Sequence, residues 1–554
     1  MRKCRNRICN NACGRKTARG RKYKPTNKHI VMGTRNMKKL VCAKSFLGVT
    51  TALLLGASAF SPTCVLADDT PQAGGDLVMV RSAPIQSFMP TLVAENGSIW
   101  ALEEVFDTLL LPTEDGKGVQ PGLATEWKQS DDGLEWTFKL RSDVKFSDGT
   151  PMTSKDVKFS LDQASNEANP FGFINAAIAE VKTPDAETVV VRTKAPFAPL
   201  PSVMAIFSNS IVPDNYGGKS AEEFAKAPVG TGPFKLAERT IGVGARLVRN
   251  TEYWQKGKPY LDSISINEVA DGNTRANQLM GGQAQINEFP AYSSTQALRA
   301  AGGDVTLGVF PSSRVDFLAF NTTKAPFDDA HVRRAIASLI DRQALIKVIL
   351  FGNGEPAGAY MSPSSWSHNA DIKGLPFDLD AAKKELAQSN VPDGFSATIS
   401  VESGDSDQAT MAQIILAQAA KIGIKLAIQV LDPAALDEAR QAANFDMAFT
   451  YNTTDIVDPD EIIRFAGVYD GGSHVQYSFY NNKEIAEKAE QAATLGEQDA
   501  RKKLYDEIQA LWDKDQPMVP LYYSPEIYSF STNVHGFHPY VTGNYNLSNV
   551  WLSH

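Results

Sequence analysis

Cysteine is scarce in this sequence of 554 residues, and the main part of the chain has none. All five cysteines come before residue 68: Cys4, Cys9, Cys13, Cys42 and Cys64. If that first segment is removed on export, as its composition indicates below, the remaining chain has no thiol with which to form a disulfide. The first three cysteines also lack the paired C-x-x-C spacing of a zinc site, so we interpret them as accidental.

Acidic side chains are missing from the same segment. Residues 1–67 hold 15 of the 55 Lys and Arg residues and no Asp or Glu, which leaves 40 basic against 63 acidic residues in the rest of the chain. That remainder has a formal charge of −23, whereas the whole sequence has a formal charge of −8. Such an acidic chain argues against nucleic acid as a partner, because phosphate binding needs a basic surface.

A hydrophobic run long enough to span a membrane is also missing. The best candidate, residues 46–60 (FLGVTTALLLGASAF), is shorter than the roughly 18 apolar residues of a spanning helix. Lys38, Lys39 and Lys44 precede it and the small-residue site Val65-Leu66-Ala67 follows it. This order is typical of a secretory signal peptide cleaved after Ala67, so we expect the mature chain in the periplasm.

Two questions stay open for this segment. A lipoprotein would be anchored through Cys64, but residues 61–63 (Ser-Pro-Thr) lack the small-residue pattern of such sites, and this alternative is less favoured. Residues 1–31 make a poor prefix for a signal peptide, so Met1, Met32 and Met37 all remain candidates for the translation start.

Signatures of catalysis and of metal binding are absent from residues 68–554. This part has no G-x-S-x-G or H-E-x-x-H motif and no cysteine. Its six histidines include His535 and His538, three positions apart, but none sits in a convincing ligand cluster. We therefore expect no enzymatic turnover, no bound metal and no cofactor.

The first half of the main chain carries signals for strands and hairpins. Strands are expected at residues 122–130 and 134–141, because Asp132-Gly133 is a strong turn signal and apolar residues alternate with polar ones after it. Thr153 and Asp156 then form a plausible capping box at the start of a helix. Together with a strand-rich stretch at residues 181–193, this pattern favours a small inserted α+β domain. A further hairpin is expected at residues 234–250.

The second half of the main chain alternates helices with strands. Helices are expected at residues 332–340, 345–349 (stopped by Gly352), 380–388, 407–421 and 435–443, and strands at residues 395–401, 424–430 and 445–451. This alternation indicates an α/β lobe with neighbouring parallel strands. A final helix at residues 482–512 and a strand at residues 521–531 follow, and the strand is expected to run back toward the first lobe. Two crossings between lobes would make a hinge.

Ligands of such sheets bind beyond the carboxyl ends of the strands. This rule directs attention to the loop after Tyr451, which reads NTTDIVDPDEII and contains Asp455, Asp458 and Asp460. Loop aspartates are often turn or helix-cap residues. For Asp458, which precedes Pro459, we prefer that structural interpretation.

From about Gly75 to its end, the chain resembles the dipeptide- and oligopeptide-binding (and nickel-binding) family of bacterial extracellular solute-binding proteins. The most specific block is GLATEWKQSDDGLEWTFKLRSDVKFSDGTPMTSKDVKFSLDQ, and VGTGPFKL and FNTTKAPFDDAHVRRAIASLIDR resemble two further blocks of the family. The resemblance implies a periplasmic component of an ABC importer that captures short peptides between two closing lobes. Another solute of the same family, such as a nickel chelate, glutathione, an opine, a sugar or haem, is the alternative ligand.

The resemblance also implies an α/β fold, the class II periplasmic-binding-protein fold with two lobes, an extra α+β domain inserted in lobe I, and a hinge. We expect a monomer whose partners are the small-molecule or peptide ligand and the permease subunits of the importer. The expected limits are residues 1–67 for the removed segment, 68–115, 229–317 and 523–554 for lobe I, 116–228 for the inserted domain, and 318–522 for lobe II.

The candidate ligand residues also follow from the resemblance. In peptide-binding members, an aspartate after a strand of lobe II pairs with the free α-ammonium of the ligand, and FDMAFTYNTTDIVDPDEII matches that segment without gaps, which places Asp455 at this position. Similar relatives carry Gly-Trp before the aspartate, where this chain has Tyr451 and Asn452, so the aromatic wall is altered. Arg314 either meets a ligand carboxylate through two parallel hydrogen bonds or is a solvated strand arginine.

Overall fold

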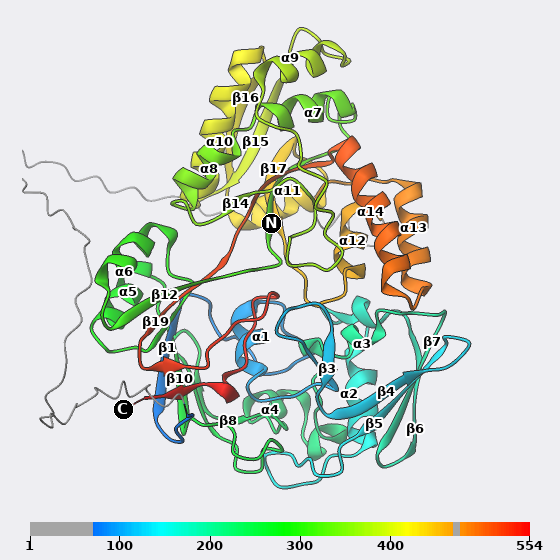
Figure 1. Ribbon diagram of the computed structural model, residues 1–554, viewed down its shortest axis with the longest axis vertical. Helices are drawn as coiled ribbons and strands as arrows, with labels where there is room; N and C mark the ends of the chain where they lie inside the picture. Colours follow the sequence, from blue (N-terminus) through cyan, green and yellow to red (C-terminus); the bar gives the residue numbers. More distant parts are fainter. Residues whose placement is uncertain (1–69, 469–476, 554) are drawn as a thin grey trace, which may run out of the picture. The chain divides into compact units, whose positions relative to one another are not determined.

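The computed structural model describes residues 70–468 and 477–553 (Figure 1). The expected signal peptide, its cleavage site, the candidate translation starts and the five cysteines all lie outside these residues. Two larger sheets and one smaller sheet organise the described part. We call the seven-stranded sheet with its neighbouring elements lobe I, and the six-stranded sheet with its helices lobe II.

The sheet of lobe I is mixed. Its strands lie in the order β12-β19-β11-β1-β10-β9-β8, with β1 parallel to β10 and β11 and the other pairs antiparallel. The expected hairpin at residues 234–250 is confirmed as the antiparallel pair β8 and β9. The strands are β1 (Asp76–Arg81), β8 (Phe234–Thr240), β9 (Gly244–Arg249), β10 (Ser263–Glu268), β11 (Ile286–Glu288), β12 (Val305–Phe310) and β19 (Glu526–Ser531).

A four-stranded antiparallel sheet in the order β4-β5-β7-β6 adjoins lobe I. Its second strand buries Trp136, Phe138 and Leu140, as the alternation predicts. The capping box is also confirmed, because the Thr153 amide donates to the Asp156 carboxylate at 2.7 Å. These elements are β4 (Ala124–Gln129), β5 (Glu135–Leu140), β6 (Ile178–Asp185), β7 (Thr188–Thr193) and α2 (Ser154–Ala164).

The four-stranded sheet shares one hydrophobic core with lobe I. Leu77 and Leu247 of the large sheet belong to the same buried cluster as Phe138 and Val189 of the small one. Other elements of this part are α1 (Asn96–Leu102), α3 (Leu200–Val203), α4 (Ala221–Lys226), α5 (Gly272–Met280), α6 (Thr295–Ala301), and the strand pairs β2 (Leu110–Pro112) with β3 (Val119–Pro121) and β20 (Val534–His535) with β21 (Trp551–Leu552).

The sheet of lobe II has the order β14-β18-β13-β17-β15-β16. The predicted parallel neighbours are confirmed, because β15 runs parallel to both β16 and β17, whereas β13 is antiparallel to β17 and β18. The strands are β13 (Val315–Phe320), β14 (Glu355–Pro356), β15 (Ser396–Glu402), β16 (Lys425–Leu431), β17 (Met447–Asn452) and β18 (Met518–Tyr523).

Helices cover both faces of this sheet (Figure 1). Along β13, Leu318 and Phe320 join the core beneath one set of helices, and Val315, Phe317 and Ala319 join the core beneath the other. Burial on both faces explains why β13 reads as a nearly continuous apolar run. The helices are α7 (Ala330–Leu339), α8 (Arg342–Ile349), α9 (Leu379–Ala387), α10 (Ser406–Ala419), α11 (Pro433–Gln441), α12 (Asp460–Gly467), α13 (Lys483–Thr494) and α14 (Gln498–Asp515).

The prediction of one helix over residues 482–512 is wrong. The chain forms α13 and α14, which are separated at residues 495–497 and pack against each other. Gly496 is a poor helix former, and it allows the chain to fold back. The fold-back places apolar residues of both helices, among them Ile485 of α13 and Trp512 of α14, in one core.

The chain crosses between the two lobes in two described segments. Residues 311–314 join β12 to β13, and residues 524–525 join β18 to β19, so the expected limits at 317/318 and 522/523 fall within β13 and β18. The Ser312 hydroxyl donates to the Ser524 carbonyl, and the Ser524 hydroxyl donates to Asp316 at 2.5 Å. These bonds tie the two crossings together where a hinge is expected.

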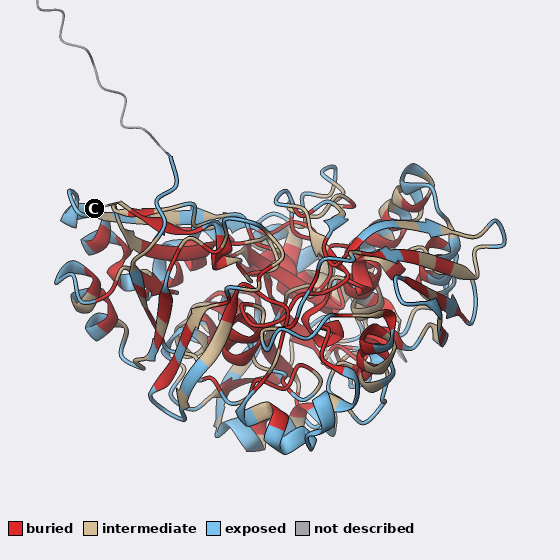
Figure 2. Cartoon of the chain, turned by 90° about the horizontal axis from the view of Figure 1, so that it is seen from below, coloured by how far each residue is buried: buried red, intermediate tan, exposed pale blue. Residues whose placement is uncertain are grey.

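Buried residues follow the inner elements, and exposed residues follow loops and outer helix faces (Figure 2). Within residues 70–468 and 477–553, no helix combines the length and the apolar character needed to cross a bilayer.

Candidate functional site

The loop that joins β17 to α12, residues 453–459, belongs to lobe II by its chain position. Its Ile456 is nevertheless buried in the hydrophobic core of lobe I. The loop therefore lies against both lobes, beyond the carboxyl end of β17, where ligands of α/β sheets bind.

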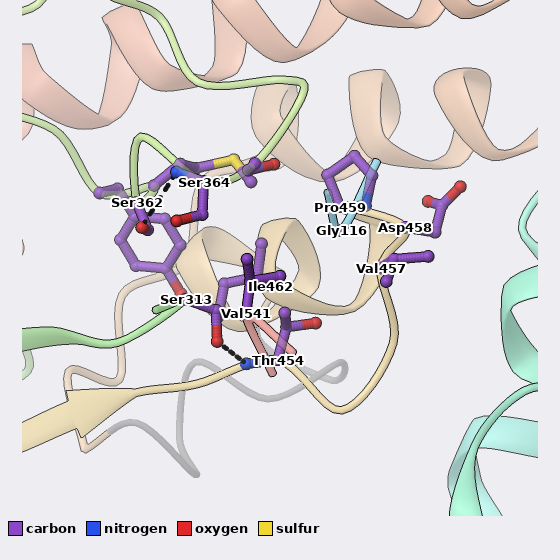
Figure 3. Close-up of a pocket in the computed structure, with 13 residues that line it drawn as sticks. Gly116, Ser313, Ser362, Ser364, Thr454, Val457, Asp458, Pro459, Ile462 and Val541 are labelled. Atoms are coloured by element: carbon purple, nitrogen blue, oxygen red, sulfur yellow. Dashed lines mark hydrogen bonds between the residues drawn. The ribbon is translucent and has the colours of Figure 1, made fainter. Parts of the chain in front are cut away.

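A pocket, here named the serine pocket, lies on one side of this loop (Figure 3). The Thr454 amide donates to the Ser313 hydroxyl at 3.2 Å, which fixes the loop to the crossing at residues 311–314. On the lobe I side, Gly116 sits so close to Val541 that an added Cβ would lie 2.2 Å from the valine methyl carbon. The lining consists of Gly116, Ser313, Tyr360, Met361, Ser362, Ser364, Ser365, Thr454, Val457, Asp458, Pro459, Ile462 and Val541.

A second, smaller pocket, here named the acidic pocket, adjoins the first, because Val457 lines both. Lobe II contributes Asp455, Ile456 and Val457 to it. Lobe I contributes Pro112, Ser202, Ala205, Thr542 and Asn544.

Asp455 is partly buried in the wall of the acidic pocket and contacts a second carboxyl group. Glu461 of α12 accepts hydrogen bonds from the Asp455 amide and the Thr454 hydroxyl, each at 2.9 Å, and its carboxyl contacts that of Asp455. Burial raises the pKa of Asp455 to about 7, and the nearby charge of Glu103 adds to this rise. Burial and the charge of Asp455 raise the pKa of Glu461 to about 8.

One carboxyl group of lobe I, that of Glu103, lies close to this pocket, and a second belongs to the next residue of the chain. Glu103, which follows α1, accepts a hydrogen bond at 2.9 Å from the side-chain amide of Asn544, and burial raises its pKa to about 8. Glu104 is buried beside it, accepts from the Leu547 amide at 2.9 Å, and has a pKa raised well above the usual range by burial.

The other two aspartates of the loop have basic partners. Asp458 forms a buried, two-pronged ion pair with Arg501 of α14, at 2.6 and 2.7 Å, and also accepts from the Asp460 amide. Asp460 pairs with Arg464 at 2.8 Å. Asp458 thus makes the expected local turn contact and in addition anchors the loop to a distant helix.

Tyr451, Asn452 and Arg314 lie outside the linings of both pockets. The guanidinium of Arg314 stacks on the exposed ring of Tyr451, 4.0 Å from its centroid, and pairs with Asp316 at 2.7 Å. Asn452 points to the opposite side of β17, where it is buried close to Tyr360. The structure therefore brings Tyr451 and Arg314 together but does not bring them to Asp455.

Both pockets are lined by acidic, hydroxyl-bearing and apolar side chains. No lysine, arginine or histidine is among the residues that line them. The part of the chain that the structure describes has no group of three or more His, Cys, Asp or Glu residues able to hold a metal ion. His331 pairs with Glu385, and His535 stacks on Trp551.

Sequence reasoning missed Glu461, Glu103 and Arg501. Glu461 lies in the loop motif itself, two residues after Pro459, and its closeness to Asp455 was the available signal. Glu103 lies hundreds of residues before the loop, and Arg501 lies tens of residues after it, so no local pattern could assign either of them to the site.

Comparisons with known proteins agree with this architecture. The model of "Bacterial extracellular solute-binding proteins, family 5 Middle" matches residues 118–473. The glutathione-binding protein GsiB of Salmonella typhi is 31% identical over 424 residues, which cover 75% of this chain and 82% of that protein.

Solved structures are similar over nearly the whole described part. The periplasmic binding protein DppA from Helicobacter pylori, in complex with the peptide STSA, is 28% identical with a TM-score of 0.76, covering 87% of this chain and 99% of that one. The binding protein AgaA from A. tumefacien R10, in complex with agropinic acid, is 27% identical with a TM-score of 0.75, covering 87% and 99%.

Proposed function

Because the chain belongs to family 5 of the bacterial extracellular solute-binding proteins, the substrate-binding components of ABC importers, we propose that it captures short peptides in the periplasm. The ligand is held between the two lobes and passed to the membrane permease. The protein acts as a monomer without turnover or cofactor, and a cleaved signal peptide exports it.

One observation carries the proposal for peptides. Asp455 lies between the lobes in the wall of the acidic pocket, and unlike Asp458 and Asp460 it has no basic partner among the described residues. A carboxylate there recognises the α-ammonium of a peptide whatever its side chains are, through a charge-assisted bond of about 1.5–3 kcal/mol. The serine pocket next to it supplies hydroxyl groups and apolar surface for the remainder of a short ligand.

The other candidate ligand residues have secondary places in this proposal. Arg314 and Tyr451 form a stacked pair outside both pockets, so they would meet only a ligand that extends beyond the pockets. Asn452 lies on the opposite side of β17 and would contribute indirectly, by contacting Tyr360 in the wall of the serine pocket.

Titration of the refolded mature chain, residues 68–554, tests the proposal. Carried-over ligand is removed by unfolding, and Ala-Ala, Ala-Ala-Ala and their N-acetylated forms are then compared by calorimetry after a thermal-shift screen. A ligand at 100 times its Kd adds about 2.7 kcal/mol of stability, which such a screen detects. We expect the acetylated peptides to bind much more weakly than the free peptides, and equal binding of both forms would contradict the role of Asp455.

A non-peptide solute is the second candidate, with the same transport role. The relatives favour testing it, because AgaA is solved with agropinic acid and GsiB is named for glutathione. Glutathione, opines, sugars, haem and nickel chelates therefore belong in the same screen. Binding of one of these solutes without binding of any peptide would change the proposed ligand but not the proposed transport role.

A further inference from the structure

The acidic pocket gathers carboxyl groups from both lobes. Asp455 forms part of its wall, Glu461 contacts Asp455, and Glu103 reaches the pocket from lobe I through Asn544. Glu461 is 5% exposed, and its Oε1 has no hydrogen-bond partner in the described structure. The same holds for Oε2 of Glu103.

Two other buried carboxylates of this chain have cationic partners, whereas Glu104 accepts from a backbone amide. Arg81 pairs with Glu288 at 3.0 Å, and Arg501 pairs with Asp458 at 2.6 Å. Within the described residues, no ion pair involves Asp455, Glu461 or Glu103. A buried charge without a partner costs several kcal/mol, so a cation that arrives with the ligand is the natural partner for these groups.

A single ammonium leaves part of this site unused. It satisfies Asp455, while the free oxygens of Glu461 and Glu103 stay buried without a partner. The two pockets also have no basic lining residue that could neutralise a carboxylate of the ligand. Both facts favour a ligand with more positive than negative charge.

We propose that the acidic pocket accepts ligands with two cationic groups close together, such as a peptide whose first residue is Lys or Arg. Asp455 binds the α-ammonium, Glu461 accepts the side-chain ammonium or guanidinium, and Glu103 faces both from lobe I. This inference rests on the proposed function, because it names the class of peptide that the same site selects.

Glu461 also has a structural role, which the experiment must separate from recognition. Its Oε2 holds the loop by accepting from the Asp455 amide and the Thr454 hydroxyl. Glutamine at this position keeps an oxygen that can accept these bonds and removes the negative charge. Glu461→Gln therefore tests the charge while the loop stays in place.

The test compares two dipeptides that differ by one charge, Lys-Ala and norleucyl-Ala, by calorimetry on refolded residues 68–554. We expect Lys-Ala to bind at least about tenfold more tightly to the wild type. Glu461→Gln and Glu103→Gln should each reduce this ratio to about threefold or less. The control is Asp513→Asn on α14, a carboxyl with a pKa raised by burial that lines neither pocket, and it should keep the full ratio.

The outcomes separate this inference from the proposed function. Equal affinity for the two dipeptides, or a ratio unchanged in both glutamine variants, would overturn the inference and leave peptide capture intact. Binding of 1,5-diaminopentane without binding of either dipeptide would support the two-cation site and contradict peptide capture. Binding of an uncharged solute alone would overturn both.

Discussion

Asp455 differs from its neighbours in the loop by its partners rather than by its position in the sequence. Asp458 and Asp460 each form an ion pair with an arginine, whereas the described partner of the Asp455 carboxyl is another carboxyl group, that of Glu461. A carboxylate in this state is stabilised by any cation that enters the pocket, and recognition of an ammonium group is the expected consequence.

Replacing Asp455 by Asn is expected to weaken the binding of peptides with a free N-terminus by roughly 10- to 100-fold, since it removes one charge-assisted bond. Calorimetry with Ala-Ala-Ala measures the loss. The same variant should leave the weaker binding of N-acetyl-Ala-Ala-Ala unchanged, because that peptide has no ammonium group to lose. Equal losses for both peptides would mean that Asp455 shapes the pocket without binding the ammonium.

The pairing of Asp455 with Glu461 also predicts how stability depends on pH. Both pKa values are raised above those of the unfolded chain, to about 7 and about 8, so the native state binds more protons than the unfolded state between about pH 5 and 8. Their contribution to the free energy of unfolding therefore falls as the pH rises through this range.

We expect Glu461→Gln to flatten this dependence and to make the ligand-free protein more stable than the wild type at pH 8, with little difference at pH 5. Urea unfolding at the two pH values measures the difference in the free energy of unfolding between the variant and the wild type. A variant that is equally destabilised at both would show that the loop contacts of Glu461 outweigh its charge.

At the scale of elements, one ion pair joins the binding loop to a distant helix. Arg501 of α14 donates to both oxygens of Asp458, and both side chains are nearly inaccessible to solvent. The loop therefore takes its position from the α13–α14 hairpin as well as from β17.

Replacing Arg501 by Met should destabilise the protein by about 3–5 kcal/mol, because it leaves the Asp458 carboxylate buried without a partner. Lys502→Met is the matched control one residue away, since Lys502 pairs with Asp506 on the helix surface and such pairs contribute about 0–1 kcal/mol. Urea unfolding of both variants measures the difference. Similar free energies of unfolding for the two variants would contradict the anchoring role.

The same elements show what the sequence could predict. The alternation in β5 and the capping box of α2 are local patterns, and the structure confirms both. The break between α13 and α14 has only Gly496 as a local signal, which a helix tolerates at a cost of about 1 kcal/mol, so it was missed. Contacts such as Glu103 with Asn544 join residues 441 positions apart, and no pattern within one segment contains them.

At the scale of the molecule, the two lobes meet at points beyond the pockets. The Ala198 amide, which lies in the expected inserted domain, donates to the Ala493 carbonyl of α13 at 2.8 Å. The rings of Phe173 and Phe465 lie 6.5 Å apart across the same boundary. Because a ligand held between lobes leaves only when they separate, these contacts are expected to control its release.

A disulfide across this boundary tests that expectation in a chain whose residues 68–554 have no cysteine of their own. The backbone hydrogen bond of 2.8 Å from Ala198 to Ala493 holds the two residues together, and a disulfide needs Cα atoms about 4.4–6.8 Å apart. We expect the double variant Ala198→Cys, Ala493→Cys to bind peptide normally when reduced. If it is oxidised with peptide bound, release should slow by at least about tenfold, and if it is oxidised empty, uptake should slow similarly.

Stopped-flow measurements with a fluorescent peptide give both rates, and addition of a reducing agent should restore them. Either single cysteine variant is the control, because it cannot close the bridge. Rates that do not change in the oxidised double variant would mean that the ligand enters and leaves without separation of α13 from the inserted domain. Such a result would place the moving boundary at the two crossings alone, where Ser312, Ser524 and Asp316 are bonded to one another.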